Sequence, residues 1–534
     1  MAQSPVKNSS RSTHEHARWP AQANIHSLPP ELLARIMLLT IRSVMMTAID
    51  DQTLVLSRVS RHWCDVALSF PRLWTSFTAD KRYSLKKARL FLERSRSATL
   101  DIDIDISPAA TEFGSGGVIA LVLTQTSRFS GLEVTTHEAE LPDELYTRPA
   151  PSLESLRIFY RPESYVDGPD ILEIPHELFN GETSSLRSLL LGGCTVIWGS
   201  SIFSKLSELK IYSNSDSVDP FITMEQMVTT LKCCAPTLET LVLCQCMAPE
   251  SSLPPSWAIQ PGAVTLSRLR RLELEALPLS FLAHFLTLVD FPPTIQIKIL
   301  EVDILENEAP ITTSFPVLPS KLFLTLYASL SPSRYLRVCI REDQLDIDMS
   351  DSDELKGEAP WYRNRVNPWF KISFMWSHIG QGVDAFTRTF HELEDLPLLE
   401  IHTLVIGGSS VPSKCSFWEG FFRNATRVQR LYLAHYRLEE EHLVNIIQVL
   451  TPTHSNQGDG GDDGLLLPSL VHLHFSTTQI QNVSVDLMLD FFKGRAHVGA
   501  RLEHVTIRKP REVNSDLQEY AELIGASLVT DGDS

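Results

Sequence analysis

One line of sequence, Leu-x-x-Leu-x-Leu, recurs along the chain after residue 100 and constrains the fold more than any other feature. Apolar residues occupy its first, fourth and sixth positions, so the last two alternate as in a strand with one buried face. Eleven copies are recognisable, and they begin at Phe129, Leu153, Leu186, Leu206, Leu238, Leu269, Ile297, Ile401, Val428, Leu470 and Leu502. In the copy at Ile297 the later apolar positions are read as Leu300 and Val302. The repetition predicts a stack of short strands that bury one side in a shared core.

Helices are predicted between several of these strands. Thr223 and Gln226 have the spacing of a capping box, and the apolar residues that follow form one stripe until Pro236. Comparable apolar stripes are present at 281–289, 443–450 and 487–492. A strand followed by a returning helix, repeated along the chain, predicts an α/β stack.

The repeats resemble those of leucine-rich-repeat proteins. In that family an Asn or Cys stands eight residues after the first leucine, where its side chain satisfies backbone groups. Cys194, Asn214 and Cys246 occupy this position in three consecutive copies. The resemblance implies a solenoid of horseshoe form, with a parallel sheet on the concave face and helices outside. The copies are unevenly spaced and none is clear between 303 and 400, so the solenoid is expected to be irregular.

Two apolar helical patterns precede the repeats. Residues 25–37 read IHSLPPELLARIM, and residues 54–74 read LVLSRVSRHWCDVALSFPRLW. Ser27 is positioned to cap a first helix, whose first turn tolerates proline because no amide hydrogen is lost there. A core of about fifty residues is marginal by itself, so these helices are expected to leave apolar surface for a partner.

This segment resembles an F-box, in which a Leu-Pro-x-Glu-Leu-Leu-x-x-Ile stretch and a later Val-Ser-Arg-x-Trp stretch form a three-helix module. The resemblance implies binding to the Skp-type adaptor of a cullin-RING ubiquitin ligase. The residues that match the family's adaptor-facing positions are Leu28, Pro29, Leu32, Leu33, Ile36, Met37, Val59 and Trp63. The hydrophobic run IRSVMMTAID at 41–50 departs from the short polar link of the family. The alternative interpretation is a helical hairpin that caps a larger domain.

The expected organisation follows from these patterns. We expect a disordered tail at 1–24, an F-box at 25–76, a linker helix at 77–97, an irregular leucine-rich-repeat domain at 98–510 and a C-terminal helix with an acidic tail at 511–534. Within the repeat domain, the acidic segment 343–358 and the Gly/Asp-rich segment 456–464 are predicted to be loops.

The predicted function is substrate recognition for a Skp-cullin-F-box ubiquitin ligase, without catalysis by the chain itself. The F-box would hold the adaptor and, through it, a cullin, while the concave face of the repeats would hold an unknown target protein. Speculative target contacts, chosen from strand orientation, are Glu154, Arg157, Lys210, Arg270, Arg271, Glu273, Arg430, Tyr432 and His472. The alternative function is a non-catalytic leucine-rich-repeat scaffold that acts outside a cullin ligase.

Several other classes are disfavoured by composition and motifs. A net charge of -18 argues against nucleic acid as the main partner. Neither a signal peptide nor a run of eighteen apolar residues is apparent, so no membrane partner and a cytoplasmic or nuclear location are expected. Gly-x-Ser-x-Gly and His-Glu-x-x-His motifs are absent, which argues against the usual hydrolases.

Two groups of metal-ligating residues remain. Cys233, Cys234, Cys244 and Cys246 lie close together, but their spacing is not that of two Cys-x-x-Cys knuckles, and Cys246 is already assigned to the repeat pattern. His472 and His504 should lie side by side on neighbouring strands about 5 Å apart, with His474 two residues along. The three imidazoles are interpreted as part of a ligand-facing surface, with metal binding or pH sensing as the minority hypothesis. No metal and no cofactor are expected.

Overall fold

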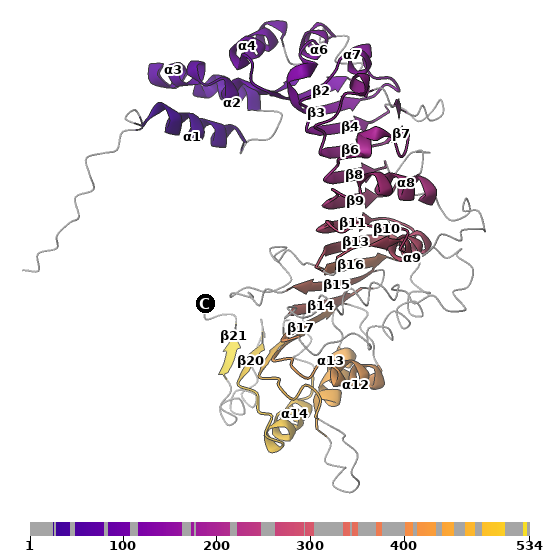
Figure 1. Cartoon of the computed structure of the whole chain (residues 1–534). Helices are drawn as coiled ribbons and strands as arrows, with labels where there is room; N and C mark the ends of the chain where they lie inside the picture. The colour runs from indigo at the N-terminus through magenta and orange to yellow at the C-terminus, as the bar shows by residue number, and fades with distance from the viewer. Residues whose placement is uncertain are drawn as a thin grey trace, which may run out of the picture. The chain divides into compact units, whose positions relative to one another are not determined.

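The chain is an α/β protein with a large, mostly parallel sheet (Figure 1). In the computed structural model the described residues are 25, 28–42, 49–79, 84–106, 116–162, 172–175, 178–213, 222–246, 262–292, 294–303, 335–341, 344–350, 370–375, 401–408, 414–433, 440–452, 465–475, 483–507 and 527–530. The chain divides into two compact units, Met1–Leu132 (unit 1) and Glu133–Ser534 (unit 2). Among the described residues, every helix is too short or too polar to cross a membrane.

Unit 1 begins with three helices that contact one another, α1 (Pro30–Arg42), α2 (Ile49–Leu56) and α3 (Arg61–Ser69). The N-terminus of α3 is capped by the Ser60 hydroxyl, which accepts a hydrogen bond from the Trp63 amide at 3.3 Å. Pro71 ends the helix because it holds the preceding residue, Phe70, in an extended conformation. The predicted cap of α1, Ser27, lies outside the described residues.

The short 3-10 helix η3 (Pro71–Trp74) ties these helices to the rest of unit 1. Trp74 is fully buried, and its indole Nε1 donates a hydrogen bond to the Ala67 carbonyl at 2.7 Å. Helix α4 (Leu85–Ser95) packs on this indole, with the Phe91 ring at 5.1 Å edge-on and the Arg94 guanidinium 4.3 Å from the ring centroid. A single buried tryptophan therefore joins α3 to α4.

Unit 1 continues into a pair of parallel strands, β1 (Ser76–Ala79) and β2 (Leu100–Ile106). Helix α6 (Gly116–Leu123) and the 3-10 helix η4 (Thr126–Arg128) follow. Strand β3 (Phe129–Thr136) then runs across the boundary into unit 2.

The first half of the sheet in unit 2 consists of parallel strands in chain order. They are β4 (Ser155–Tyr160), β6 (Ser188–Gly192), β8 (Glu208–Tyr212), β9 (Thr240–Cys244), β11 (Arg271–Glu275) and β13 (Gln296–Asp303). Their register aligns one buried apolar residue from each strand in a row, namely Leu156, Leu189, Leu209, Leu241, Leu272 and Ile297. The leucines of the repeated line are thus the inward face of a continuous parallel ladder.

The second half of the sheet repeats this arrangement. Strands β17 (Thr403–Gly408), β18 (Arg430–Leu433), β19 (His472–Phe475), β20 (His504–Ile507) and β21 (Ser527–Thr530) pair in parallel, each with the next. The expected C-terminal helix and tail at 511–534 is wrong for residues 527–530, which extend the ladder as β21. Backbone pairing with β20 decides this, and the sequence of a four-residue edge strand carries little signal of it.

Between the two halves lie β14 (Tyr335–Ile340), β15 (Gln344–Ser350) and β16 (Phe370–Met375). Strand β16 pairs in parallel with β13, and β14 pairs in parallel with β17, whereas β15 runs antiparallel between them. The prediction of a loop at 343–358 is therefore wrong for residues 344–350. The acidity of this segment suggested exposure, but Leu345, Ile347 and Met349 alternate with its aspartates and are buried on one face.

The aspartates of β15 lie on the opposite face, where the neighbouring strands supply their partners. Asp348 pairs across the sheet with Arg337 of β14, at 3.3 Å between Oδ2 and the guanidinium, and both side chains are mostly buried. Burial raises the pKa of Asp348, although the charges of Arg337 and Lys371 oppose the rise. An acidic strand is thus accommodated inside the sheet because basic side chains lie on both flanking strands.

Each of the eleven repeated lines contains a strand, namely β3, β4, β6, β8, β9, β11, β13, β17, β18, β19 or β20. One copy was aligned wrongly. Ile297 and Ile299 lie opposite Leu272 and Leu274, so the line in β13 begins three residues earlier than the assignment that starts at Ile297. The strand is irregular between Ile299 and Val302, where Glu301 has a positive φ of 52°. This bulge interrupts the regular alternation of the strand, so the register could not be read from the sequence pattern.

Helices cover the apolar side of the sheet. They are α7 (Asp143–Thr147), α8 (Met224–Cys234), α9 (Leu279–Leu288), α12 (Cys415–Arg423), α13 (Glu440–Leu450) and α14 (Val485–His497), with 3-10 turns η5 (Leu178–Gly181) and η6 (Ser201–Phe203). Two small parallel pairs accompany them, β5 (Leu172–Ile174) with β7 (Cys194–Val196) and β10 (Val264–Thr265) with β12 (Val289–Asp290). In Figure 1, α8 and α9 lie on one side of the strands in unit 2.

Helix α8 forms as its sequence predicts. The Thr223 hydroxyl accepts a hydrogen bond from the Gln226 amide at 3.2 Å, and Gln226 Oε1 accepts one from the Thr223 amide at 2.9 Å. This capping box satisfies two amide groups that the first turn leaves open. The methionines and aliphatic residues of the helix stripe are buried. The predicted tail at 1–24, the predicted loop at 456–464 and Asn214 all lie outside the described residues.

Candidate interaction surfaces

Helix α1 has two apolar faces, of which one is buried and one is exposed. Leu33 and Met37 are fully buried in unit 1. Leu32, Ile36 and Leu39 are 50%, 41% and 60% exposed. Their spacing of four and three residues places them on one stripe of the helix. We call Leu32, Ile36 and Leu39 the outer stripe of α1.

More exposed apolar residues belong to α2, α3 and the turn between them, namely Val55, Val59 and Leu68. Of the residues predicted from the resemblance, Pro29, Leu32, Ile36 and Val59 are exposed and Leu28 is half-buried. The remaining three, Leu33, Met37 and Trp63, are buried in unit 1, so they hold the helices in place and offer little surface to a partner. The predicted contacts did not include Leu39, Val55 and Leu68. Helical spacing alone does not reveal which face of a helix the neighbouring helices cover.

The sheet of unit 2 has a polar face opposite the buried leucines. In register across the strands, this face carries the row Arg157, Leu190, Lys210, Val242, Glu273 and Lys298. Three of the predicted target contacts, Arg157, Lys210 and Glu273, lie in this row. Arg271 lies in the adjacent row, whereas Glu154 and Arg270 are exposed just before their strands begin.

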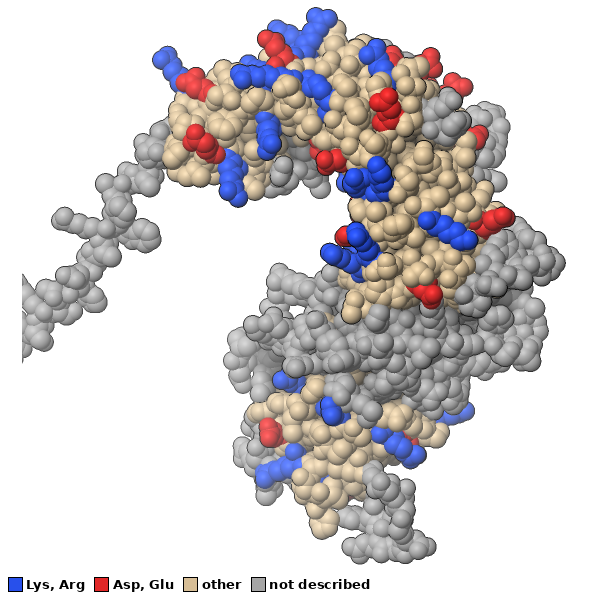
Figure 2. Space-filling view, viewed as in Figure 1, with Lys and Arg blue, Asp and Glu red and all other residues tan. Residues whose placement is uncertain are grey.

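Several charged residues of this polar face form ion pairs. Arg157 lies 3.2 Å from Glu133, Lys210 lies 2.7 Å from Glu208, and Arg271 lies 2.5 Å from Glu273. The more exposed Arg270 lies 3.7 Å from Glu239. Lys and Arg side chains are accordingly interspersed with Asp and Glu on the coloured surface in Figure 2. Such a surface suits a polar protein partner of mixed charge better than a polyanion.

Glu208 illustrates how these pairs act. Partial burial raises the pKa of its carboxyl, but hydrogen bonds from Lys210 and Ser188, together with the charges of Lys210 and Arg157, outweigh burial and lower the pKa overall. The Ser188 hydroxyl donates to Glu208 Oε2 at 2.6 Å. The carboxylate is therefore held ionised and fixed on the open face.

A third surface lies on the second half of the ladder, where the sequence placed three histidines. His472 of β19 and His504 of β20 are direct register partners, and their rings stack with centroids 4.7 Å apart and planes at 23°. The side-by-side arrangement of these two residues is confirmed. His474 instead lies against Tyr432, with ring centroids 5.1 Å apart. The predicted contacts Arg430 and Tyr432 are the β18 partners of His472 and His474.

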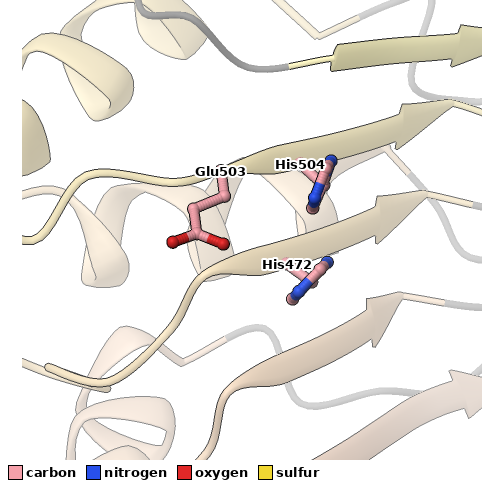
Figure 3. A group of neighbouring side chains, drawn as sticks. All are labelled: His472, Glu503 and His504. Atoms are coloured by element: carbon pink, nitrogen blue, oxygen red, sulfur yellow. The ribbon is translucent and has the colours of Figure 1, made fainter.

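The structure adds a residue that the sequence analysis missed. Glu503 precedes His504, and one ligand atom from each of His472, Glu503 and His504 lies within 4.8 Å of the others (Figure 3). The signal in the sequence was only the adjacency of Glu503 to His504. Burial lowers the pKa of His472, as do the charges of His504 and Arg430, while Glu503 opposes the shift. The neutral form of this imidazole is therefore favoured near neutral pH.

The cysteine group does not form a comparable site. Within the part of the chain that the structure describes, the metal-ligating residues that converge in a group of three or more are those around His472. Burial raises the pKa of the Cys234 thiol and of the Cys246 thiol to about 12. Zinc binds thiolates, so burial of these thiols in apolar surroundings disfavours metal binding there. Cys194 and Cys246 are both buried.

No family model matches the chain, and no curated protein matches it in sequence.

Proposed function

We propose that the chain is the substrate-recognition subunit of a Skp-cullin-F-box ubiquitin ligase. In this proposal residues 25–76 are the F-box that binds a Skp-type adaptor, and the repeated strands of unit 2 are an irregular leucine-rich-repeat solenoid that binds a target protein. The adaptor would bring in a cullin. The protein would act in the cytoplasm or the nucleus and would not itself be an enzyme.

The observation that carries the proposal is the outer stripe of α1. The helix already buries Leu33 and Met37 on another face, so its own fold does not require a second apolar face. Adjacent large apolar residues on a folded helix mark an interaction site for a protein partner. Leu32 and Ile36 are also the positions at which the F-box resemblance expects the adaptor to bind.

The polar face of the unit 2 sheet supports the second half of the proposal. Its parallel strands present short rows of side chains in register, and several of its cations form ion pairs with neighbouring glutamates. Complementary charge patterns contribute to partner specificity and to the rate of encounter more than to raw affinity. This is the property that a receptor for one class of target needs.

Mechanistically, the chain would raise the effective concentration of a target beside the ubiquitin-conjugating machinery. A target held on unit 2 while unit 1 holds the adaptor becomes part of one assembly, so the transfer step becomes effectively intramolecular. The covalent chemistry would be supplied by the other subunits.

The test is affinity purification of the wild-type chain and of the double variant Leu32→Arg plus Ile36→Arg. Two charges on the outer stripe should abolish recovery of adaptor and cullin. The matched control is Arg35→Ala, an exposed polar position on the same helix, which should leave recovery unchanged. Equal recovery of adaptor and cullin with both the wild type and the double variant would refute the proposal.

The same experiment separates the alternative function. Recovery of the adaptor without any cullin would favour a leucine-rich-repeat scaffold outside a ligase. If the ligase assignment is right, a protein bound to unit 2 should accumulate in cells that express the double variant in place of the wild type.

A further inference from the structure

Backbone pairing between β19 and the start of β20 positions His472, Glu503 and His504. The amides of Glu503 and His504 both donate to the Val471 carbonyl, at 2.8 and 3.1 Å, which fixes the start of β20 against β19. The two histidines then face one another across the parallel pair, and Figure 3 shows the three side chains beside one another. Among the described residues, strand pairing sets the positions of His472, Glu503 and His504 relative to one another.

We propose that these three residues bind a divalent transition-metal ion, with zinc as the reference metal. Two imidazole nitrogens and one carboxylate oxygen are a ligand set that zinc accepts, and three protein ligands leave a coordination position open. The proposal concerns unit 2 alone and does not depend on the proposed function of the chain.

The distances are compatible with a metal after small side-chain movements. Bonds of about 2.0–2.1 Å in a tetrahedral site place ligand atoms roughly 3.3 Å apart. The corresponding atoms here lie within 4.8 Å of one another, so they must approach by about 1.5 Å. The stacked rings of His472 and His504 must also turn, so that a nitrogen lone pair of each ring points at the ion. Glu503 and His504 are exposed, and rotation about their side-chain bonds provides this movement without any shift of the strands.

Charge distinguishes the class of metal. The group supplies a single carboxylate, and Arg430, the β18 partner of His472, adds a positive charge beside it. Calcium and magnesium are bound mainly by several oxygen ligands of negative charge, which this group does not provide. Imidazole ligands select zinc, copper or nickel, so the site is expected to discriminate against the alkaline-earth ions.

The environment also permits access. His472 is half-buried while Glu503 and His504 are exposed, so an ion can enter from solvent and still be partly enclosed by the sheet. The open coordination position would face outward from the polar side of the ladder. A bound metal would therefore add an electrophilic contact point to this surface.

The experiment is equilibrium dialysis of the full chain against zinc chloride, followed by metal analysis. Variants Glu503→Gln and His504→Ala are compared with the wild type and with the control His474→Gln, which changes an imidazole of β19 that lies outside the group. Loss of a residue that only supports a ligand typically costs about 10–100-fold in metal affinity, so losing a direct ligand should cost at least about tenfold. The wild type and His474→Gln should each retain one equivalent of zinc. His504→Ala should lose it, and Glu503→Gln should bind it at least about tenfold more weakly.

Cobalt substitution provides an independent readout. A cobalt ion held by two imidazoles and a carboxylate should give visible absorption without the intense thiolate band that cysteine ligands would produce. Calcium at the same concentration should not compete with zinc. Equal zinc content in all four proteins, a thiolate band in the cobalt spectrum, or displacement of zinc by calcium would each overturn the proposal.

Discussion

Truncation of the outer stripe of α1 should weaken binding of a Skp-type adaptor without unfolding unit 1. Full burial of a Leu or Ile side chain stabilises by about 1.5–3 kcal/mol. Leu32 is 50% exposed and Ile36 is 41% exposed, so docking can bury only these fractions. The two side chains together would then contribute about 1.4–2.7 kcal/mol to binding. This corresponds to roughly a ten- to hundredfold change in Kd, and the Cβ that alanine retains favours the lower end.

The assay is isothermal titration calorimetry of a purified Skp-type adaptor against the wild type and against Leu32→Ala plus Ile36→Ala. Thermal unfolding of each protein is measured in parallel. The matched control is Leu33→Ala on the buried face of the same helix. Leu33 is 0% exposed, so its truncation should cost about 2–5 kcal/mol of stability and lower the unfolding temperature of unit 1.

Two results would refute this reasoning. An unchanged Kd for the double alanine variant would mean that the outer stripe is not the binding surface. A loss of thermal stability as large as that of Leu33→Ala would mean that Leu32 and Ile36 contribute to the core of unit 1 and are not poised for a partner.

Three further predictions concern unit 2, and the first of them has a comparison variant in unit 1. Gly408→Ala should destabilise the β17 end of the sheet by more than about 1–3 kcal/mol, because φ is 125° and a Cβ would overlap the Ile340 backbone. Gly117→Ala changes the second residue of α6, where a Cβ meets no described atom within 4 Å, so it should leave stability unchanged or raise it by at most about 0.5–1 kcal/mol. Equal exchange of the β17 amide hydrogens in the two variants would contradict both expectations. Iodoacetamide at pH 7.5 should leave Cys246 unmodified in the folded chain, because burial raises the thiol pKa to about 12, and its rapid alkylation without denaturant would show that this site opens. The pKa of Glu208 is lowered in the folded chain, so its contribution to stability is complete above the ordinary pKa and is lost as the pH falls through the lowered value. The free energy of unfolding of Glu208→Gln should therefore fall less steeply with acidification than that of the wild type.

Much of the strand pattern could be predicted because the relevant interactions are local. The alternation of apolar residues in a short segment decides which side chains face the core, whatever the neighbouring strand is. The cap of α8 depends on Thr223 and Gln226, only three residues apart, so it is also readable from the sequence. The proximity of His472 and His504 followed from their equivalent positions in two copies of the same line.

The candidate sites were harder to predict because they depend on neighbours far along the chain. Glu503 joins the two histidines only because β20 pairs with β19 in one particular register. Trp63 matched the sequence landmark of a binding surface, yet the packing of α3 places it in the core. The same distinction separates Leu32 from Leu33, which are adjacent in sequence and opposite in exposure.

The sequence by itself therefore determined the repeated strands, the helices that return between them and the apolar character of the N-terminal helices. Each of these depends on periodicity or on contacts a few residues apart. Only the tertiary structure decided that the acidic segment 344–350 is a strand, since Arg337 and Lys371 approach it from flanking strands distant in sequence. It also decided which face of α1 remains exposed and which acidic residue joins His472 and His504, because burial and convergence are properties of packed elements and not of any one segment.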